Sequence, residues 1–186
     1  MSEVGVQLSE SFTIQAPVDE VWAYFQDPQR VAKCVPGADL DQVVNQNHFK
    51  GGVKVKMGPV GLKFKGELQV TERNEASHRV VMKAKGNAEG GKGQAEASVT
   101  AQLQGSGDST TVKLDQDISL TGAAAQYGRG MMSDVLSVLI KQFSQCVQSD
   151  LSGKGPTAKS SMGGMGLMAG STKAGLKRIF GGGKKE

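Results

Sequence analysis

The sequence predicts an α+β fold in which a curved antiparallel sheet packs against one long C-terminal helix. Between residues 40 and 121, apolar and polar side chains alternate with a period of two, which is typical of strands with one buried and one wet face. Between residues 123 and 151, apolar residues recur at helical spacing and no proline occurs. Because each part has one apolar face, we expect the helix to pack on the sheet so that both faces are buried.

Size and composition indicate one soluble domain with an appendage. The chain has 186 residues, of which 38% are hydrophobic and 22% charged, so a fibre and a polytopic membrane protein are both excluded. No segment approaches the roughly 20 apolar residues that cross a bilayer. The first residues lack a basic start followed by an apolar run, and we expect no secretory signal.

The N-terminal part predicts one strand and two short helices. Residues 4–15 alternate loosely, although Glu10 falls on the apolar side and weakens the pattern. Pro17 suits the first position of a helix, because proline loses no needed hydrogen bond there. A second short helix is expected at residues 29–34, where a Pro-Gly pair follows.

The middle of the chain predicts a meander of strands joined by turns such as Gly58-Pro59. The clearest strands are residues 49–57, 62–70, 80–85, 95–103 and 112–120. The expected C-terminal helix follows, with its apolar stripe at Met132, Val135, Leu136, Leu139, Phe143 and Val147. Its opposite side carries Ser137, Lys141, Ser144, Gln145 and Gln148, and we expect that side to face solvent.

Cysteine and histidine are too scarce for several kinds of site. Cys34 and Cys146 rule out a disulfide-rich scaffold, and neither has a C-x-x-C partner or a local base. Both are therefore expected to remain thiols in a reducing compartment. The two histidines, His48 and His78, fall at solvated positions. We expect neither a metal site nor a histidine-centred triad.

The inward-facing positions of the expected sheet are often small, as at Gly51, Gly66, Ala84, Ala95, Ala97 and Ala101. Since protein interiors are close-packed, such a face predicts a space that an apolar ligand fills. The alternative is that small residues let the helix approach closely. The predicted lining is Trp22, Phe25, Val53, Val55, Met57, Phe64, Met82, Ala84, Ala97, Val99, Ala101, Gln116, Tyr127, Met131, Met132 and Val135.

Polar groups in this lining are few. The Gln116 amide either donates to a ligand carbonyl or satisfies a backbone group, and Tyr127 either bonds a ligand or lies at the rim. Paired acids such as Asp115 and Asp117 lie on the wet face. Because the inner face lacks a convergent acid and base, no catalytic residue is expected and the protein is predicted not to be an enzyme.

Short motifs in a fixed order resemble a known family. The opening resembles the START-like, polyketide-cyclase-like superfamily, with FTIQAPVDEVW at residues 12–22, DP at 27–28 and CVPG at 34–37. The match narrows to the family of the carbon monoxide dehydrogenase G-subunit through FKG at 49–51, VKVKMGPV at 53–60, FKG at 64–66 and the spacing of Gly122, Ala125 and Gly128. The resemblance covers roughly residues 4–151.

The resemblance implies a helix-grip fold, in which the sheet wraps around the helix and leaves a hydrophobic tunnel. Proteins of this family accompany molybdenum hydroxylases that oxidise carbon monoxide or related substrates, and are thought to connect them to the membrane. No motif here is typical of molybdopterin, iron–sulfur or flavin binding, so those cofactors are expected in the partner. Superfamily oxygenases need two histidines near a carboxylate, which this sequence does not offer.

Charge divides the chain into two parts. Residues 1–151 carry 15 basic and 17 acidic side chains, whereas residues 152–186 carry 7 basic and one acidic. The second part also has the glycine-rich composition of a linker. We therefore expect a START-like ligand-binding domain at residues 1–151 and a flexible tail at residues 152–186.

The tail predicts a short amphipathic segment that binds membranes. Three apolar side chains fall at i, i+3 and i+4 with basic side chains beside them, as in Lys173, Leu176, Lys177, Arg178, Ile179 and Phe180. Each basic residue near an anionic leaflet contributes about 1 kcal/mol, and ordering the glycine-rich chain offsets much of this, so binding is expected to be reversible. A solvated extension is the alternative. A nucleic-acid arm is disfavoured, since no aromatic residues interleave with the charges.

These expectations combine into a non-enzymatic carrier. Its ligand is expected to be an isoprenoid quinone of the menaquinone or ubiquinone type, with no covalent cofactor. It is expected to shuttle the quinone between the membrane and a carbon monoxide dehydrogenase-type molybdenum hydroxylase, from a cytoplasmic position at the inner face of the cell membrane. The alternative is a recruitment or assembly adaptor for that enzyme without ligand transport. A cyclase or hydrolase is a third option that lacks its acid and base.

Overall fold

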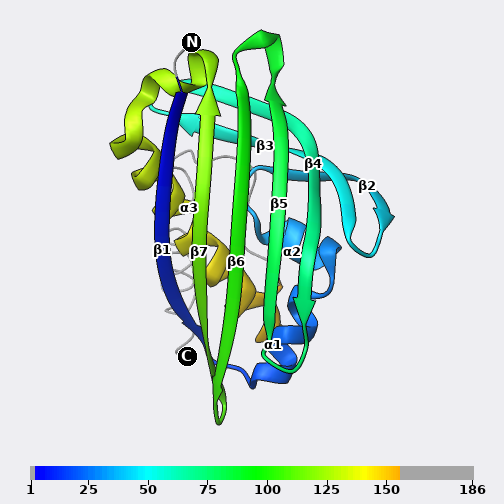
Figure 1. Cartoon of the computed structure of the whole chain (residues 1–186). Coiled ribbons are helices and arrows are strands. Elements are labelled where there is room, and N and C mark those ends of the chain that lie inside the picture. The colour runs from blue at the N-terminus through cyan, green and yellow to red at the C-terminus, as the bar shows by residue number, and fades with distance from the viewer. Residues whose placement is uncertain (1–2, 156–186) are drawn as a thin grey trace, which may run out of the picture.

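The computed structural model describes residues 3–155, which form a single sheet with helices on one of its sides (Figure 1). Three α-helices occur in this part of the chain, with two 3₁₀ turns, η1 and η2. The elements follow in the order β1 (Glu3–Ile14), α1 (Val18–Phe25), α2 (Pro28–Cys34), β2 (Ala38–Asn45), β3 (His48–Met57), β4 (Val60–Asn74), β5 (Arg79–Ala88), η1 (Glu89–Gly91), β6 (Gln94–Ser106), β7 (Ser109–Thr121), η2 (Gly122–Tyr127) and α3 (Gly128–Leu151).

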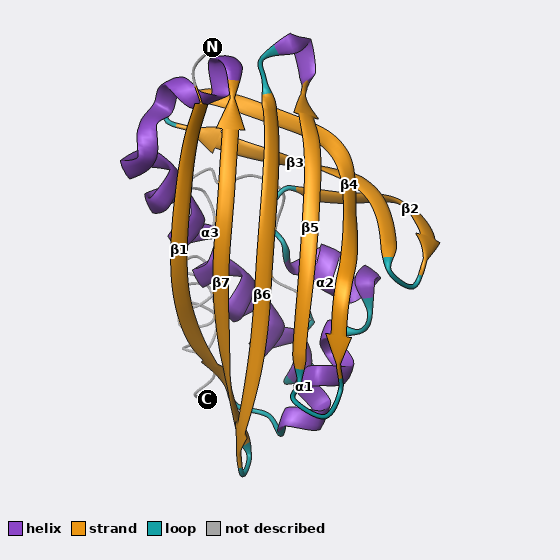
Figure 2. Ribbon diagram, viewed as in Figure 1, coloured by secondary structure: helices purple, strands orange, loops and turns teal. Residues whose placement is uncertain are grey.

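The sheet has seven antiparallel strands in the order β1-β7-β6-β5-β4-β3-β2 (Figure 2). Strands β2 to β7 pair with their neighbours in sequence, and β1 closes the meander by pairing with β7 from Glu3↔Thr121 to Ile14↔Thr110. Helix α3 lies on one side of this sheet, behind it in Figure 1, and packs mainly along β1. The α+β, helix-grip architecture predicted from the sequence is confirmed.

Local features explain where α2 and α3 begin. The Asp27 side chain caps α2 by accepting hydrogen bonds from the backbone N–H groups of Gln29 and Arg30, at 3.0 and 3.2 Å. The expected helix over residues 123–151 begins later than predicted. Its first residues form η2 instead, and Gly128, at a φ of +75°, separates that turn from the regular helix.

A row of glycines bends the sheet. Gly51, Gly66 and Gly86 lie side by side in register on β3, β4 and β5. A Cβ atom on Gly66 would lie 1.9 Å from the carbonyl oxygen of Lys85, and one on Gly51 would lie 2.2 Å from that of Asp39. The interpretation that Gly51 and Gly66 are small in order to leave ligand space is wrong, because the close backbone approach itself requires glycine there.

Two hydrophobic clusters fill the space between the sheet and the helices. One surrounds the C-terminal half of α3 and consists of Ile14, Ala16, Val21, Trp22, Tyr24, Cys34, Val80, Ala101, Leu103, Val112, Leu114, Ile140, Cys146 and Val147. The other surrounds the start of α3 and consists of Val6, Met57, Leu62, Phe64, Ala88, Leu120, Ala124, Ala125 and Met132. The helix is therefore anchored at both ends.

A disulfide joins Cys34 at the end of α2 to Cys146 near the end of α3. Both cysteines are fully buried, and their Cα atoms are 5.3 Å apart. The expectation that they remain free thiols is therefore wrong. The residues are 112 positions apart, so no local pattern reveals their pairing before α2 and α3 are folded together.

No helix within residues 3–155 combines the length and the apolar character needed to cross a membrane.

Candidate functional site

The concave face of the sheet carries a half-buried apolar band between the two hydrophobic clusters. We call it the central band, and it consists of Leu8, Met82, Ala84, Ala97, Val99, Gln116 and Ile118. One row of it runs straight across the sheet, because Met82 pairs with Val99, Val99 with Gln116, and Gln116 with Leu8. All seven residues are partly accessible to solvent, although they lie on interior strands or beneath the helix.

This partial exposure has a structural cause. Helix α3 packs closely on β1 and makes fewer contacts with the middle strands. Two residues that its sequence places toward the sheet side, Val135 and Leu139, are likewise half-buried, and Val138 beside them is 45% exposed. An accessible apolar strip in the middle of a concave face is a typical setting for an apolar ligand.

The structure distributes the sixteen predicted lining residues over three environments. Five are buried in the two clusters and serve as core, namely Trp22, Met57, Phe64, Ala101 and Met132. Met131 is 38% exposed. The remaining ten are half-buried, namely Phe25, Val53, Val55, Met82, Ala84, Ala97, Val99, Gln116, Tyr127 and Val135. The structure brings five of these ten, on β5, β6 and β7, into the central band.

Gln116 is the polar member of the central band. Its side-chain nitrogen Nε2 is buried and has no hydrogen-bond partner among the described residues. Its neighbours across the strands, Leu8 and Val99, are apolar and offer no acceptor. A buried donor left unpaired costs about 1–3 kcal/mol. Of the two roles that the sequence left open, satisfying a backbone group does not occur in this structure.

Glu10 supplies a second polar group at the edge of the central band. It lies on β1 two residues beyond Leu8, on the same face, and accepts a hydrogen bond from the Ser137 hydroxyl of α3. Ser137 was expected on the solvent side of the helix, and that expectation is wrong. The one sequence signal for this pair was the presence of Glu10 on the apolar side of its strand.

A separate polar cluster lies at the end of α3 and consists of Tyr24, Arg30 and Asp150. The Arg30 guanidinium lies 4.4 Å from the centre of the Tyr24 ring and forms an ion pair with Asp150, Nη2 to Oδ2, at 3.2 Å. The Tyr24 hydroxyl is 3.1 Å from Sγ of Cys34. Burial, together with the neighbouring Asp150 carboxylate, raises the pKa of Tyr24. The cluster fastens α2 to the end of α3, which is a structural role.

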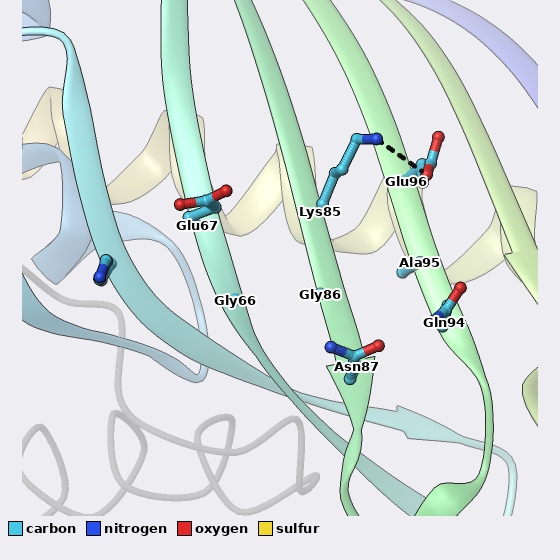
Figure 3. A pocket seen from close by; sticks show the side chains of 9 residues that line it. Gly66, Glu67, Lys85, Gly86, Asn87, Gln94, Ala95 and Glu96 are labelled. Atoms are coloured by element: carbon cyan, nitrogen blue, oxygen red, sulfur yellow. Dashed lines mark ion pairs between the residues drawn. The ribbon is translucent and has the colours of Figure 1, made fainter.

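One hollow lies elsewhere, on the convex face of the sheet (Figure 3). It has a volume of 540 Å³, and its floor includes the glycines of the bend, Gly66 and Gly86. Its walls carry charges of both signs, including the ion pair of Lys85 with Glu96 at 3.3 Å. A second hollow of 370 Å³ lies between β1 and the end of α3. Neither contains a predicted lining residue.

Titratable side chains do not converge anywhere in residues 3–155 as a metal site requires: no three His, Cys, Asp or Glu side chains are placed together there. The concave face offers chiefly apolar surface, one unpartnered amide and one carboxylate. The sheet and the long helix place the protein in the class of helix-grip domains, here with an accessible apolar inner face. The chain belongs to the CoxG family, that of the carbon monoxide dehydrogenase G-subunit, whose model matches residues 11–152.

Solved structures share this fold at low sequence identity. A conserved protein from Geobacillus kaustophilus has a TM-score of 0.72 and 20% identity, over 79% of this chain and 95% of that one. The Zhui aromatase/cyclase from Streptomyces sp. R1128 has a TM-score of 0.59 and 14% identity, over 79% and 93%. Norcoclaurine synthase from Thalictrum flavum has a TM-score of 0.51 and 14% identity, over 78% and 88%. No curated protein matches the sequence.

Proposed function

We propose that the protein is a non-enzymatic carrier that binds an isoprenoid quinone on the central band. It takes the quinone, of the menaquinone or ubiquinone type, from the membrane and presents it to a molybdenum hydroxylase of the carbon monoxide dehydrogenase type. Membership of the CoxG family supports the association with that enzyme. The quinone is inferred because an apolar carrier bound to such an enzyme needs a ligand that accepts its electrons and dissolves in the membrane.

The observation that carries the proposal is the central band with its unpartnered Gln116 amide. An apolar strip alone suits any lipid chain, whereas a buried donor without a partner suits a ligand that has an oxygen acceptor within an otherwise apolar frame. A quinone has carbonyl oxygens on an apolar ring with an isoprenoid chain. It therefore matches both properties.

The lack of convergent acid and base groups supports a carrier over an enzyme. On the described concave face, the Glu10 carboxylate accepts a hydrogen bond from the Ser137 hydroxyl, and within residues 3–155 no three His, Cys, Asp or Glu side chains lie together. Two proteins with the same fold are a cyclase and a synthase, so the scaffold itself permits catalysis. The composition of the face is what supports the proposal here.

The membrane step rests on the tail. Its amphipathic segment (residues 173–180) lies outside the described residues, as does most of the expected tail domain (residues 152–186). The described chain leaves α3 beside the Arg30–Asp150 ion pair, so the tail begins at the anchored end of the helix. The Cys34–Cys146 disulfide counts against the expected cytoplasmic position, because such bonds persist in oxidising surroundings. The position that we propose is therefore reversible association with a membrane surface.

The test is mass spectrometry of an organic extract from the purified full chain. We expect an isoprenoid quinone at a molar amount close to that of the protein. Ala97→Trp fills the middle of the central band and should remove the quinone. The matched control is Glu96→Trp, since Glu96 directly precedes Ala97 on β6 and lies at the hollow of the convex face (Figure 3). A wild-type extract with no quinone, or with mixed fatty acids alone, would overturn the proposal.

A recruitment adaptor without ligand transport is the alternative that the family also permits. Ala97→Trp separates the two, because plugging the central band stops a carrier and leaves an adaptor working. Electron transfer from the partner enzyme to membrane quinone should fall in this variant if the protein is a carrier. Unchanged transfer with normal docking would favour the adaptor.

A further inference from the structure

We propose that Gln116 and Glu10 form the polar end of the binding site and distinguish the oxidised from the reduced form of the carried ring. This inference rests on the proposed quinone carrier. Gln116 is the residue that donates to a ring oxygen in either form. Glu10 is the residue that accepts a hydrogen bond from a ring hydroxyl, which only the reduced form, the quinol, possesses.

The register of β1 and β7 places the two side chains together. Leu8 lies opposite Gln116 and Glu10 lies opposite Leu114, so Gln116 and Glu10 are diagonal neighbours on the same face. Diagonal neighbours in an antiparallel pair are about 7–8 Å apart at the backbone, which long side chains span. A ring that lies over Leu8 therefore has a hydrogen-bond donor, the Gln116 amide, within reach on one side. It has a hydrogen-bond acceptor, the Glu10 carboxylate, within reach on the other.

The hydrogen-bonding state of each group defines its role. Gln116 Nε2 is buried and unpartnered, so a ligand oxygen can accept a hydrogen bond from this amide without breaking one within the protein. Ser137 occupies one oxygen of Glu10 and fixes the carboxylate on the concave side. The other carboxylate oxygen has no hydrogen-bond partner within residues 3–155. It can accept from a hydroxyl, and it repels the lone pairs of a carbonyl.

Two conclusions follow for binding. Both redox forms gain from Gln116, because a carbonyl and a hydroxyl oxygen each accept hydrogen bonds. Only the quinol gains from Glu10, through a charge-assisted hydrogen bond that is stronger than a neutral one. The site is thus expected to hold the quinol more tightly than the quinone, and Glu10 to be the origin of that preference.

The experiment measures binding of three probes to the full chain: a short-chain isoprenoid naphthoquinone, its quinol under anaerobic conditions, and a saturated isoprenoid hydrocarbon. Gln116→Leu should weaken quinone binding about fivefold, as the loss of one neutral hydrogen bond implies, and leave hydrocarbon binding unchanged. The control is Gln69→Leu, which removes an exposed glutamine from β4. Glu10→Gln should lower the quinol-to-quinone affinity ratio about tenfold.

Thermal unfolding of the ligand-free variants separates a ligand role from a structural one. Because the Gln116 amide is unpartnered, Gln116→Leu should not lower the Tm, whereas loss of a structural hydrogen bond would lower it. The inference is overturned if the wild type binds quinone and Gln116→Leu binds it equally well, or if Glu10→Gln leaves the affinity ratio unchanged. If the wild type binds neither redox form, the carrier proposal fails as well.

Discussion

Replacing the Cys34–Cys146 disulfide should strongly destabilise the domain. The bridge links residues 112 positions apart, so its loss frees a long loop in the unfolded chain. The chain-entropy relation gives about 5 kcal/mol for a loop of this length, and measured losses of native disulfides are about 2–5 kcal/mol. Since domains of this kind are stable by about 5–15 kcal/mol, the effect is a large share of the total.

Urea unfolding of the Cys34→Ser/Cys146→Ser double variant measures this loss. We expect a lower midpoint and a free energy of unfolding reduced by about 2–5 kcal/mol. The wild type with a thiol reductant should approach the double variant. The reductant should not affect the variant itself, which serves as the control.

The opposite result has a clear meaning. If reductant leaves the unfolding midpoint of the wild type unchanged, and if both cysteines of the native protein react with a thiol reagent after unfolding without reduction, the bridge is absent in solution. The expectation from the sequence, two free thiols, would then stand, and the attachment of α2 to α3 would rest on Arg30, Tyr24 and Asp150.

Three further predictions concern the bend, the buried tyrosine and the tail. Gly66→Ala should lower the free energy of unfolding by about 3 kcal/mol, because the new Cβ meets the Lys85 carbonyl oxygen. Gly61→Ala on the same strand is the control and should be tolerated, because its Cβ meets nothing within 4 Å. Equal urea midpoints for the two variants would refute the role of the bend. The folded state raises the pKa of Tyr24, so the stability that its neutral hydroxyl contributes is present below about pH 10 and is lost as the pH rises further. Tyr24→Phe should flatten this part of the stability-against-pH curve, and an unchanged slope would show that other groups cause it. Deleting residues 152–186 should abolish sedimentation with anionic liposomes while leaving the fold of residues 3–151 intact by circular dichroism; a truncated chain that still sediments would place the membrane-binding surface on the domain.

The strands and the long helix could be predicted because their signals are local. Alternation along residues 95–103 and 112–120 already assigned Ala97, Val99 and Gln116 to one face, and the structure places them there in register. The apolar stripe of α3 likewise indicated which part of the helix is buried, as Met132 and Val147 show. Patterns with periods of 2 and 3.6 residues report on the nearest neighbours of each side chain.

The features that escaped prediction depend on contacts between distant segments. The disulfide requires α2 and the end of α3 to meet, and the Glu10–Ser137 hydrogen bond requires β1 to lie under α3. The glycine row was misread because the sequence shows that Gly66 is small, but not that the Lys85 carbonyl occupies the space of its missing side chain. The predicted lining residues were expected to surround one cavity, whereas Trp22 and Met132 belong to two separate hydrophobic clusters.

A crystal structure of the full chain with a short-chain isoprenoid naphthoquinone tests the central claim most directly. The account predicts the ring over the central band between α3 and strands β5 to β7, with a ring oxygen within hydrogen-bonding distance of Gln116 Nε2. A ring bound instead in the charged hollow of the convex face, or no bound ring at saturating quinone, would contradict it.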